Sequence, residues 1–132
     1  MSRKHITELY KIPVILLDSI TEIRPSDTES IIISASHGGI SSGGYASNIR
    51  SAIVFFNDAG VGKDGAGIAA LEILQDYNIA AGTTDFMSAR IGDSIDVWEN
   101  GIISHLNLLA EKAGFQVGIS LRQQIEELFK IN

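Results

Sequence analysis

The sequence predicts a single α/β domain over residues 1–132, a three-layer α/β/α sandwich with a mainly parallel sheet of about four to five strands. Continuous apolar runs, such as residues 31–33 and 52–56, alternate along the chain with segments of helical periodicity. Runs that are apolar at every position are typical of parallel strands, which helices cover on both faces. The length of 132 residues suits one domain with a sizeable core.

The first half of the chain is expected to contain two helices and three strands. A short helix is predicted over residues 3–10, and a strand over residues 12–20, where Pro13 lies near the start and its missing N–H is tolerated. The apolar runs at residues 30–36 and 52–57 predict two more strands. A short helix over residues 43–51 is expected to connect them.

The second half begins with a helix over residues 65–77, for which Asn78 is a suitable C-cap, and a strand over residues 78–84. The longest helix is predicted over residues 93–113. Its apolar residues recur at intervals of three or four: Ile95, Trp98, Ile102, Leu106, Leu109 and Ala113.

Capping residues mark the ends of the last two helices. Asp93 or Ser94 is a suitable N-cap for the longest helix, and Gly114 suits the position after its end. A short edge strand is expected over residues 115–119. The spacing of Ser120 and Gln123 then predicts a final helix that extends to residue 130.

Composition excludes several classes of function. The net charge of −6 and the scattered positions of the ten basic residues argue against nucleic-acid binding. The chain has no cysteine, which excludes disulfides, thiolate metal sites and cysteine nucleophiles. We expect no membrane partner, because no apolar window is long enough to cross a bilayer and the N-terminus lacks the pattern of a signal peptide. A cytoplasmic location follows as the expectation.

The first candidate site segment is residues 36–44, which contains four glycines and three serines after a predicted strand. Ligands of open parallel sheets bind at the carboxyl ends of the strands. His37 is the candidate general acid or base there, because its reference pKa is near 6.5. The loop amides form a candidate anion cradle, with Gly38, Gly39, Ser41 and Ser42 as binding residues. The alternative is a surface loop in which His37 caps local carbonyl groups.

The second candidate segment is residues 57–67, after the next strand. Asp58 is expected to orient His37, and the residues expected to contact the ligand are Asn57, Gly60, Gly62 and Lys63. The glycines match G-x-G-x-x-G in form, but Asp64 stands where a pyrophosphate would lie, and the chain is too short for a full dinucleotide-binding fold. The segment also lacks the first glycine and the Ser or Thr of a P-loop. An alternative for Asp64 is that it caps the following helix.

The positions of His37-Gly38 and Asp58-Ala59 are similar to those of the catalytic segments in cysteine proteases with neighbouring parallel strands. The resemblance implies a comparable sheet. It does not imply the activity, because the chain has no cysteine. Gly39-Ile-Ser41-Ser-Gly43 also has the letters of a serine-hydrolase elbow, but the flanking glycines do not suit its strand–turn–helix context.

The third candidate segment, residues 82–94, supplies Ser88 and Arg90. The guanidinium of Arg90 could hold a carboxylate or phosphate in two hydrogen bonds. The alternative is that Arg90 pairs with Asp85 or Asp93 and only stabilises the loop. His105 is expected to pack beside the apolar face of the longest helix.

These segments lead to one main hypothesis, a small enzyme in which His37 and Asp58 carry out acid–base chemistry on an anionic small molecule, as a hydrolase, lyase or isomerase. The alternative is a non-catalytic ligand-binding or regulatory module that uses the same crevice. No cofactor is expected, apart from a variant in which Mg²⁺ binds Asp58, Asp64 and Asp85. The apolar surface of the predicted long helix suggests a homo-oligomer.

Overall fold

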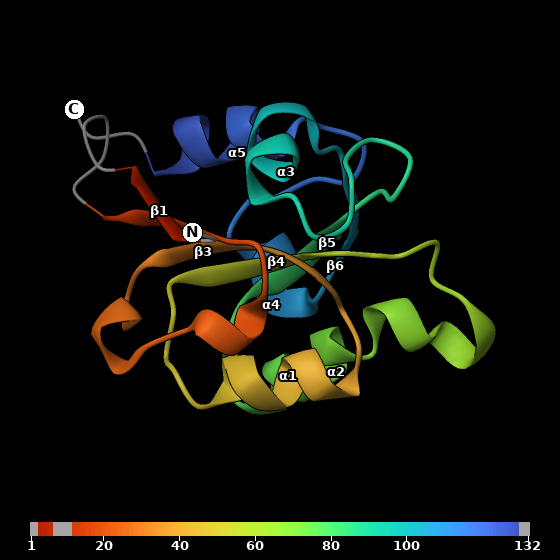
Figure 1. Ribbon diagram of the computed structural model, residues 1–132, viewed down its shortest axis with the longest axis horizontal. Helices are drawn as coiled ribbons and strands as arrows, with labels where there is room; N and C mark the ends of the chain where they lie inside the picture. Colours follow the sequence, from red (N-terminus) through yellow and green to blue (C-terminus); the bar gives the residue numbers. More distant parts are fainter. Residues whose placement is uncertain (1–2, 7–11, 130–132) are drawn as a thin grey trace.

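The computed structural model describes residues 3–6 and 12–129, and in these ranges the chain forms a mixed α/β fold around a single six-stranded sheet (Figure 1). The strands follow one another across the sheet in the order β1-β2-β3-β4-β5-β6. Strands β2 to β5 are parallel, and the two edge strands are antiparallel to their neighbours. The strands are β1 (Arg3–Ile6), β2 (Val14–Leu17), β3 (Ile31–His37), β4 (Ile53–Asn57), β5 (Ala81–Thr84) and β6 (Ile103–Leu106).

Helices lie against both faces of the sheet (Figure 1). The described ranges contain five α-helices, which are α1 (Ile40–Ser47), α2 (Ala70–Asp76), α3 (Ser94–Asn100), α4 (Leu108–Lys112) and α5 (Leu121–Leu128). They also contain the 3-10 helices η1 (Ile20–Glu22), η2 (Pro25–Asp27) and η3 (Lys63–Ile68). One apolar cluster joins the sheet to α1 and α2, and another joins it to α3 and α5. Strand β3 serves both clusters, because Ile32 points to one and its neighbours Ile31 and Ile33 to the other.

The connections between the central strands place helices on one face of the sheet before β5 and on the other face after it. The strands lie in sequence order across the sheet, so each connection from β2 to β5 leads to the next strand, and α1 and α2 lie on the same face. After β5 the chain passes to the other face, where α3 packs. The loops that follow the adjacent strands β4 and β5 therefore leave the sheet toward opposite faces. Both loops start at the carboxyl ends of parallel strands, the end of the sheet where open α/β folds commonly bind ligands.

The predicted strands in the middle of the chain are confirmed as β3, β4 and β5; β3 lies one residue later than predicted, and β4 and β5 begin later than predicted. The strand predicted over residues 12–20 is limited to Val14–Leu17, because the chain turns into η1 at Ile20. The sheet has six strands, more than the number predicted, because two predicted helical segments contain edge strands.

The long helix predicted over residues 93–113 is wrong. Asp93 does cap α3 by accepting a hydrogen bond from the Asp96 amide, but α3 ends at Asn100. Gly101 then takes an extended conformation, where an added Cβ would lie 2.5 Å from the Val97 oxygen. The chain continues into β6 because pairing with β5 outweighs the helical spacing of the apolar residues. Trp98 is buried inside the domain, so the apolar face that suggested an oligomer does not form.

Two predictions near the ends of the chain are also corrected. Residues 3–6, predicted as helical, form β1, while residues 7–11 lie outside the described ranges. No strand forms over residues 115–119; an isolated bridge between Ile102 and Ser120 lies directly after them. Ser120 does cap α5 through its hydroxyl, as its spacing predicts, and the described part of that helix ends at Leu128. No helix in the described ranges is long and apolar enough to cross a bilayer.

An ion pair ties β1 to η2. Arg3 Nη1 and Nη2 donate to the two carboxylate oxygens of Asp27 at 3.0 and 2.9 Å, and Asp27 is buried. Burial raises the pKa of Asp27, but the hydrogen bonds from Arg3 and from the Arg24 amide, together with their positive charges, hold it below the usual value. Asp27 therefore stabilises the fold at neutral pH, and this contribution is lost as the pH falls through the lowered pKa.

Replacing Asp27 with Asn should make the free energy of unfolding depend less on pH in the acidic range. We expect Asp27→Asn to lower the free energy of unfolding at pH 7 by about 2 kcal/mol, because Arg3 loses its carboxylate partner. Between about pH 5 and pH 2, urea unfolding should show a smaller loss of stability in the variant than in the wild type. Asp76→Asn, at an exposed position of α2, is the control and should keep the wild-type slope. Equal slopes for Asp27→Asn and the wild type would contradict this role.

Candidate functional site

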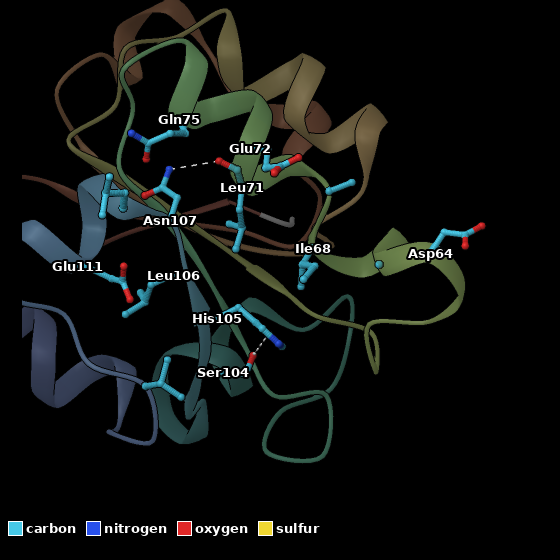
Figure 2. Close-up of a pocket in the computed structure, with 14 residues that line it drawn as sticks. Asp64, Ile68, Leu71, Glu72, Gln75, Ser104, His105, Leu106, Asn107 and Glu111 are labelled. Carbon is cyan, nitrogen blue, oxygen red and sulfur yellow. Dashed lines mark hydrogen bonds between the residues drawn. The ribbon is translucent and has the colours of Figure 1, made fainter.

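A groove of about 620 Å³ lies between the α2 side of the molecule and strand β6 (Figure 2). This volume is in the range of small-molecule sites. One wall comes from η3 and α2, including Ile68 and Leu71, and the other from β6 and the start of α4. His105 and Ser104 lie on the β6 wall, where Figure 2 shows their side chains next to each other.

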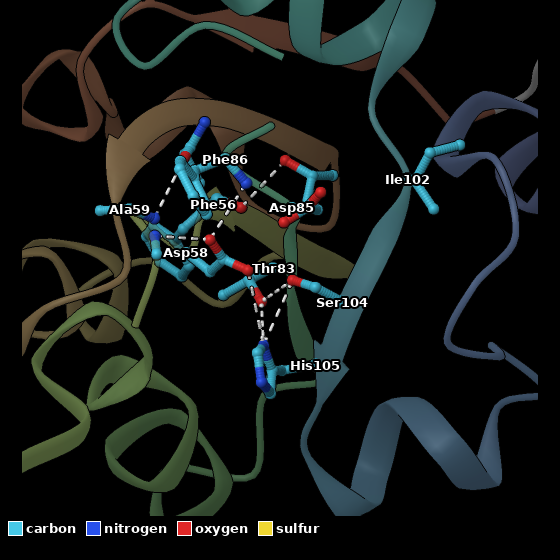
Figure 3. A network of polar contacts seen from close by, with 12 residues as sticks. Phe56, Asp58, Ala59, Thr83, Asp85, Phe86, Ile102, Ser104 and His105 are labelled. Atoms are coloured by element: carbon cyan, nitrogen blue, oxygen red, sulfur yellow. Dashed lines mark hydrogen bonds and ion pairs between the residues drawn. The ribbon is translucent and has the colours of Figure 1, made fainter. Parts of the chain in front are cut away.

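His105 lies among polar groups that all face its Nδ1 atom (Figure 3). Thr83, directly opposite on β5 and fully buried, places its Oγ1 atom 3.2 Å from Nδ1. The Oδ2 atom of Asp58 lies 3.8 Å from the same nitrogen. The ring is partly exposed on the groove side, with 37% of the side chain accessible. No hydrogen bond to Nε2 is found within the described ranges, so this nitrogen can face a ligand.

A bulge in β6 gives this arrangement its second hydroxyl group, that of Ser104. His105 pairs with Thr83, and Ile103 pairs with Thr84, so Ser104 is an extra residue with no partner on β5. In a regular strand Ser104 and His105 would point to opposite faces. With the bulge, the Ser104 Oγ atom lies 2.9 Å from Thr83 Oγ1 and 3.2 Å from His105 Nδ1.

Asp58 joins the two loops that leave the sheet in opposite directions. It follows β4 directly, is 3% exposed, and its Oδ1 atom accepts hydrogen bonds from the amides of Gly60 at 2.8 Å and Phe86 at 3.1 Å. The first amide belongs to its own loop and the second to the loop after β5. These bonds fix the carboxylate and leave Oδ2 directed toward His105.

The backbone of the loop after β4 is strained. Ala59, Val61 and Asp64 all have positive φ angles, and for Val61, which is β-branched, the value of 66° is unusual. Gly67 holds the loop in this conformation, since its amide donates to the backbone oxygen of Val61 at 2.6 Å. A Cβ atom at this position would overlap the backbone carbonyl oxygen of Asp58. Asp64 does not act as the predicted helix cap, because it lies inside η3.

His37 lies at the end of β3, and its side chain is exposed. Within the described ranges no hydrogen bond or ion pair joins His37 to Asp58, and the imidazole ring near the Asp58 carboxylate is that of His105. The segment predicted as a glycine-rich loop is helical from Ile40, so the helix predicted over residues 43–51 begins three residues earlier. Gly39 is its N-cap, Ser42 Oγ donates to the His37 oxygen, and Ser41 is exposed.

Several predicted binding amides have partners inside the protein. The Gly38 amide donates to the Asn57 oxygen, the Gly60 amide to Asp58, and the Gly62 amide to the Gly60 oxygen. Asn57 is fully buried, and its side chain links the Ala89 oxygen to the Ala59 amide. These residues shape the loops. Their ligand contacts stay a prediction.

The cationic and hydroxyl side chains predicted to bind a ligand, those of Lys63, Arg90 and Ser88, lie outside the groove lining. Lys63 is exposed, and Arg90 is 79% exposed and lies 3.4 Å from Asp93, the pairing that sequence offered as an alternative. Ser88 Oγ donates to the Asp85 oxygen and accepts from the Ile102 amide. The Arg90 amide and the Asn100 side chain lower the pKa of Asp96, which they contact.

The three carboxylates considered for Mg²⁺, from Asp58, Asp64 and Asp85, are not gathered into a metal site. Within residues 3–6 and 12–129, no group of three or more His, Asp or Glu side chains is placed to hold a metal ion. Comparison with protein-family models, with curated proteins and with solved structures finds no match for this chain. The site is therefore interpreted from its own geometry.

Sequence reasoning missed His105 as a site residue because it placed the residue on a helix. One signal could have corrected this, because Gly101 interrupts the helical pattern. Thr83 was included in a predicted strand, but no pattern marked its hydroxyl as a partner of a histidine.

The close packing of Gly67 against Asp58 predicts a strong and position-specific effect of an added methyl group. We expect Gly67→Ala to lower the free energy of unfolding by about 2–4 kcal/mol, because the loop that carries Asp58 must shift. Gly44→Ala is the matched control: its Cβ meets no atom within 4 Å inside helix α1, so it should stabilise the protein by about 0.5–1 kcal/mol. Urea unfolding measures both, and similar effects of the two substitutions would contradict the packing described here.

Proposed function

We propose that this protein is a small-molecule enzyme in which His105 is the general acid or base and the substrate binds in the groove between α2 and β6. The observation that carries the proposal is the position of His105. One ring nitrogen faces the buried Asp58 and Thr83, and the ring lines a groove of ligand size. The same site can perform the reaction classes expected from the sequence, hydrolysis, elimination or isomerisation, because each of these requires proton transfer.

Asp58 and Thr83 act as positioning residues in this proposal. A carboxylate near Nδ1 favours the tautomer with a proton on Nδ1, which leaves the Nε2 lone pair free to take a proton. The carboxylate also stabilises the imidazolium that then forms. The 3.8 Å separation between Asp58 Oδ2 and Nδ1 is longer than a hydrogen bond, and such contacts commonly tighten when a substrate binds.

The proposal gives His105 the role that the sequence assigned to His37, and it keeps Asp58 as the orienting group. We also propose that the helices on the two faces make the domain a three-layer α/β/α sandwich, since a separate apolar cluster supports each layer. We propose homo-oligomer formation as well, and its support is the set of exposed apolar side chains near the carboxyl end of the sheet, which include Ile40, Met87 and Ile91.

Exchanging the two histidines for glutamine separates the two assignments. The activity to measure is proton transfer on simple probes: hydrolysis of p-nitrophenyl acetate, and exchange of α-protons of small ketones with D₂O followed by NMR. We expect His105→Gln to lower the enzymatic rate by at least about 100-fold, with the fold intact, because a positioned acid or base contributes that much. His37→Gln should keep the wild-type rate.

Loss of activity in His37→Gln with full activity in His105→Gln would contradict the assignment and return the role to His37. The alternative function, a non-catalytic binding module, has a different signature. In that case a probe would bind in the groove, and no product would form even after long incubation with excess protein.

A further inference from the structure

The lining of the groove has an unbalanced charge. Three carboxylates line it, from Asp64 on η3, Glu72 on α2 and Glu111 on α4, and none of the described lysines or arginines does. Figure 2 shows these side chains on separate elements, with the Asp64 carboxylate directed away from the other labelled residues. Carboxylates on separate elements make the potential at the groove negative, and apolar lining helps to concentrate it.

Among the residues that the structure describes, the carboxylates have no cationic partner. All three are exposed, and no ion pair in the described ranges includes them. The charge is also local to this groove. A second hollow, of about 390 Å³ beside β1, is lined by Arg3, Lys4 and Arg24 together with Asp27. The acidic lining therefore distinguishes this groove from the second hollow.

The groove also has an apolar part to its lining, beside the polar residues Gln75, Ser104, His105 and Asn107. The apolar residues include Ile68, Leu71, Leu106, Leu108 and Val117. An apolar lining of this kind selects a ligand with a hydrocarbon body. The carboxylates then favour a ligand with a positive charge. A metal ion does not fit, because no group of three or more His, Asp or Glu side chains in the described ranges is placed to hold one.

We infer that the groove binds a small organic cation, a protonated amine on a compact hydrocarbon body, with the charge near Glu72 or Glu111 and the body directed toward His105. The inference rests on the proposed function, because it assigns the substrate class of the same groove. It differs from the anionic ligand expected from the sequence, whose cationic contacts, Lys63 and Arg90, are not in the groove lining.

Three probes with the same branched hydrocarbon body test the charge preference: 3-methylbutylamine, 3-methylbutanol and 3-methylbutanoate. Each is titrated at pH 7 into ¹⁵N-labelled protein up to about 50 mM, and binding is followed by the amide shifts of Leu106 and Leu108. We expect the amine to bind at least about tenfold more tightly than the alcohol, and the carboxylate to bind most weakly.

Isosteric substitutions identify the carboxylates responsible. Glu72→Gln with Glu111→Gln should lower the affinity for the amine to about that for the alcohol, a loss of about tenfold, and leave the affinity for the alcohol unchanged. The matched control is Glu99→Gln with Glu127→Gln, which removes the same charge from exposed positions on α3 and α5. The control should change the affinity for the amine by less than about twofold.

Three outcomes would overturn the inference: equal or tighter binding of the carboxylate, an equal loss of affinity in the control variant, or no shift of groove amides with any probe. Tighter binding of the alcohol or the carboxylate would reject the cation and leave the groove and His105 in place. The proposed function fails by a different measurement, the unchanged turnover of His105→Gln, so the two failures are distinguishable.

Discussion

The side chain of Asn107 fixes strand β6, and the site depends on the position of that strand. Its Oδ1 atom accepts hydrogen bonds from the amides of Ala81 on β5 and Ala110 on α4. Its Nδ2 atom donates to the Leu71 oxygen on α2 and to the Ile79 oxygen before β5. Asn107 is buried, so loss of these bonds would leave buried backbone groups without partners, which costs about 1–3 kcal/mol for each group. The antiparallel pairing that results places His105 opposite Thr83 and in front of Asp58.

The other half of the site comes from a loop that the fold holds in a strained conformation. A strained backbone conformation persists only where the surrounding packing stabilises it. Here the stabilising contact is the close packing of Gly67 against the backbone of Asp58. Gly38 adds to it, since a Cβ atom there would lie 2.6 Å from the Gly67 oxygen. The glycines that suggested an anion cradle therefore allow close backbone packing. The result is a buried carboxylate with one oxygen bound to two amides and the other near a histidine.

The sequence was sufficient for the parts of the fold that continuous apolar runs define. Strands β3 and β4 are buried along most of their length, and burial on both faces leaves a clear apolar pattern in the sequence. Asp58 was predicted because it follows such a strand, and the same reasoning selected His37, whose side chain is exposed. Strand β6 could not be predicted in this way. Its residues fit helical spacing, and only their pairing with β5 makes them a strand. The contact between His105 and Asp58 joins residues far apart in the chain, and no local pattern encodes it.

The central claim is that Asp58 and Thr83 hold His105 Nδ1, while Nε2 faces the groove. The most direct measurement is the tautomer of the neutral His105 ring, from long-range ¹H–¹⁵N NMR spectra of the wild type and of Asp58→Asn. We predict that the wild-type ring carries its proton on Nδ1, and that the population of this tautomer falls in the variant. The reason is that the hydrogen-bond partner of one ring nitrogen determines which of the two nitrogens carries the proton. A wild-type ring with its proton on Nε2, unchanged by the substitution, would contradict the account.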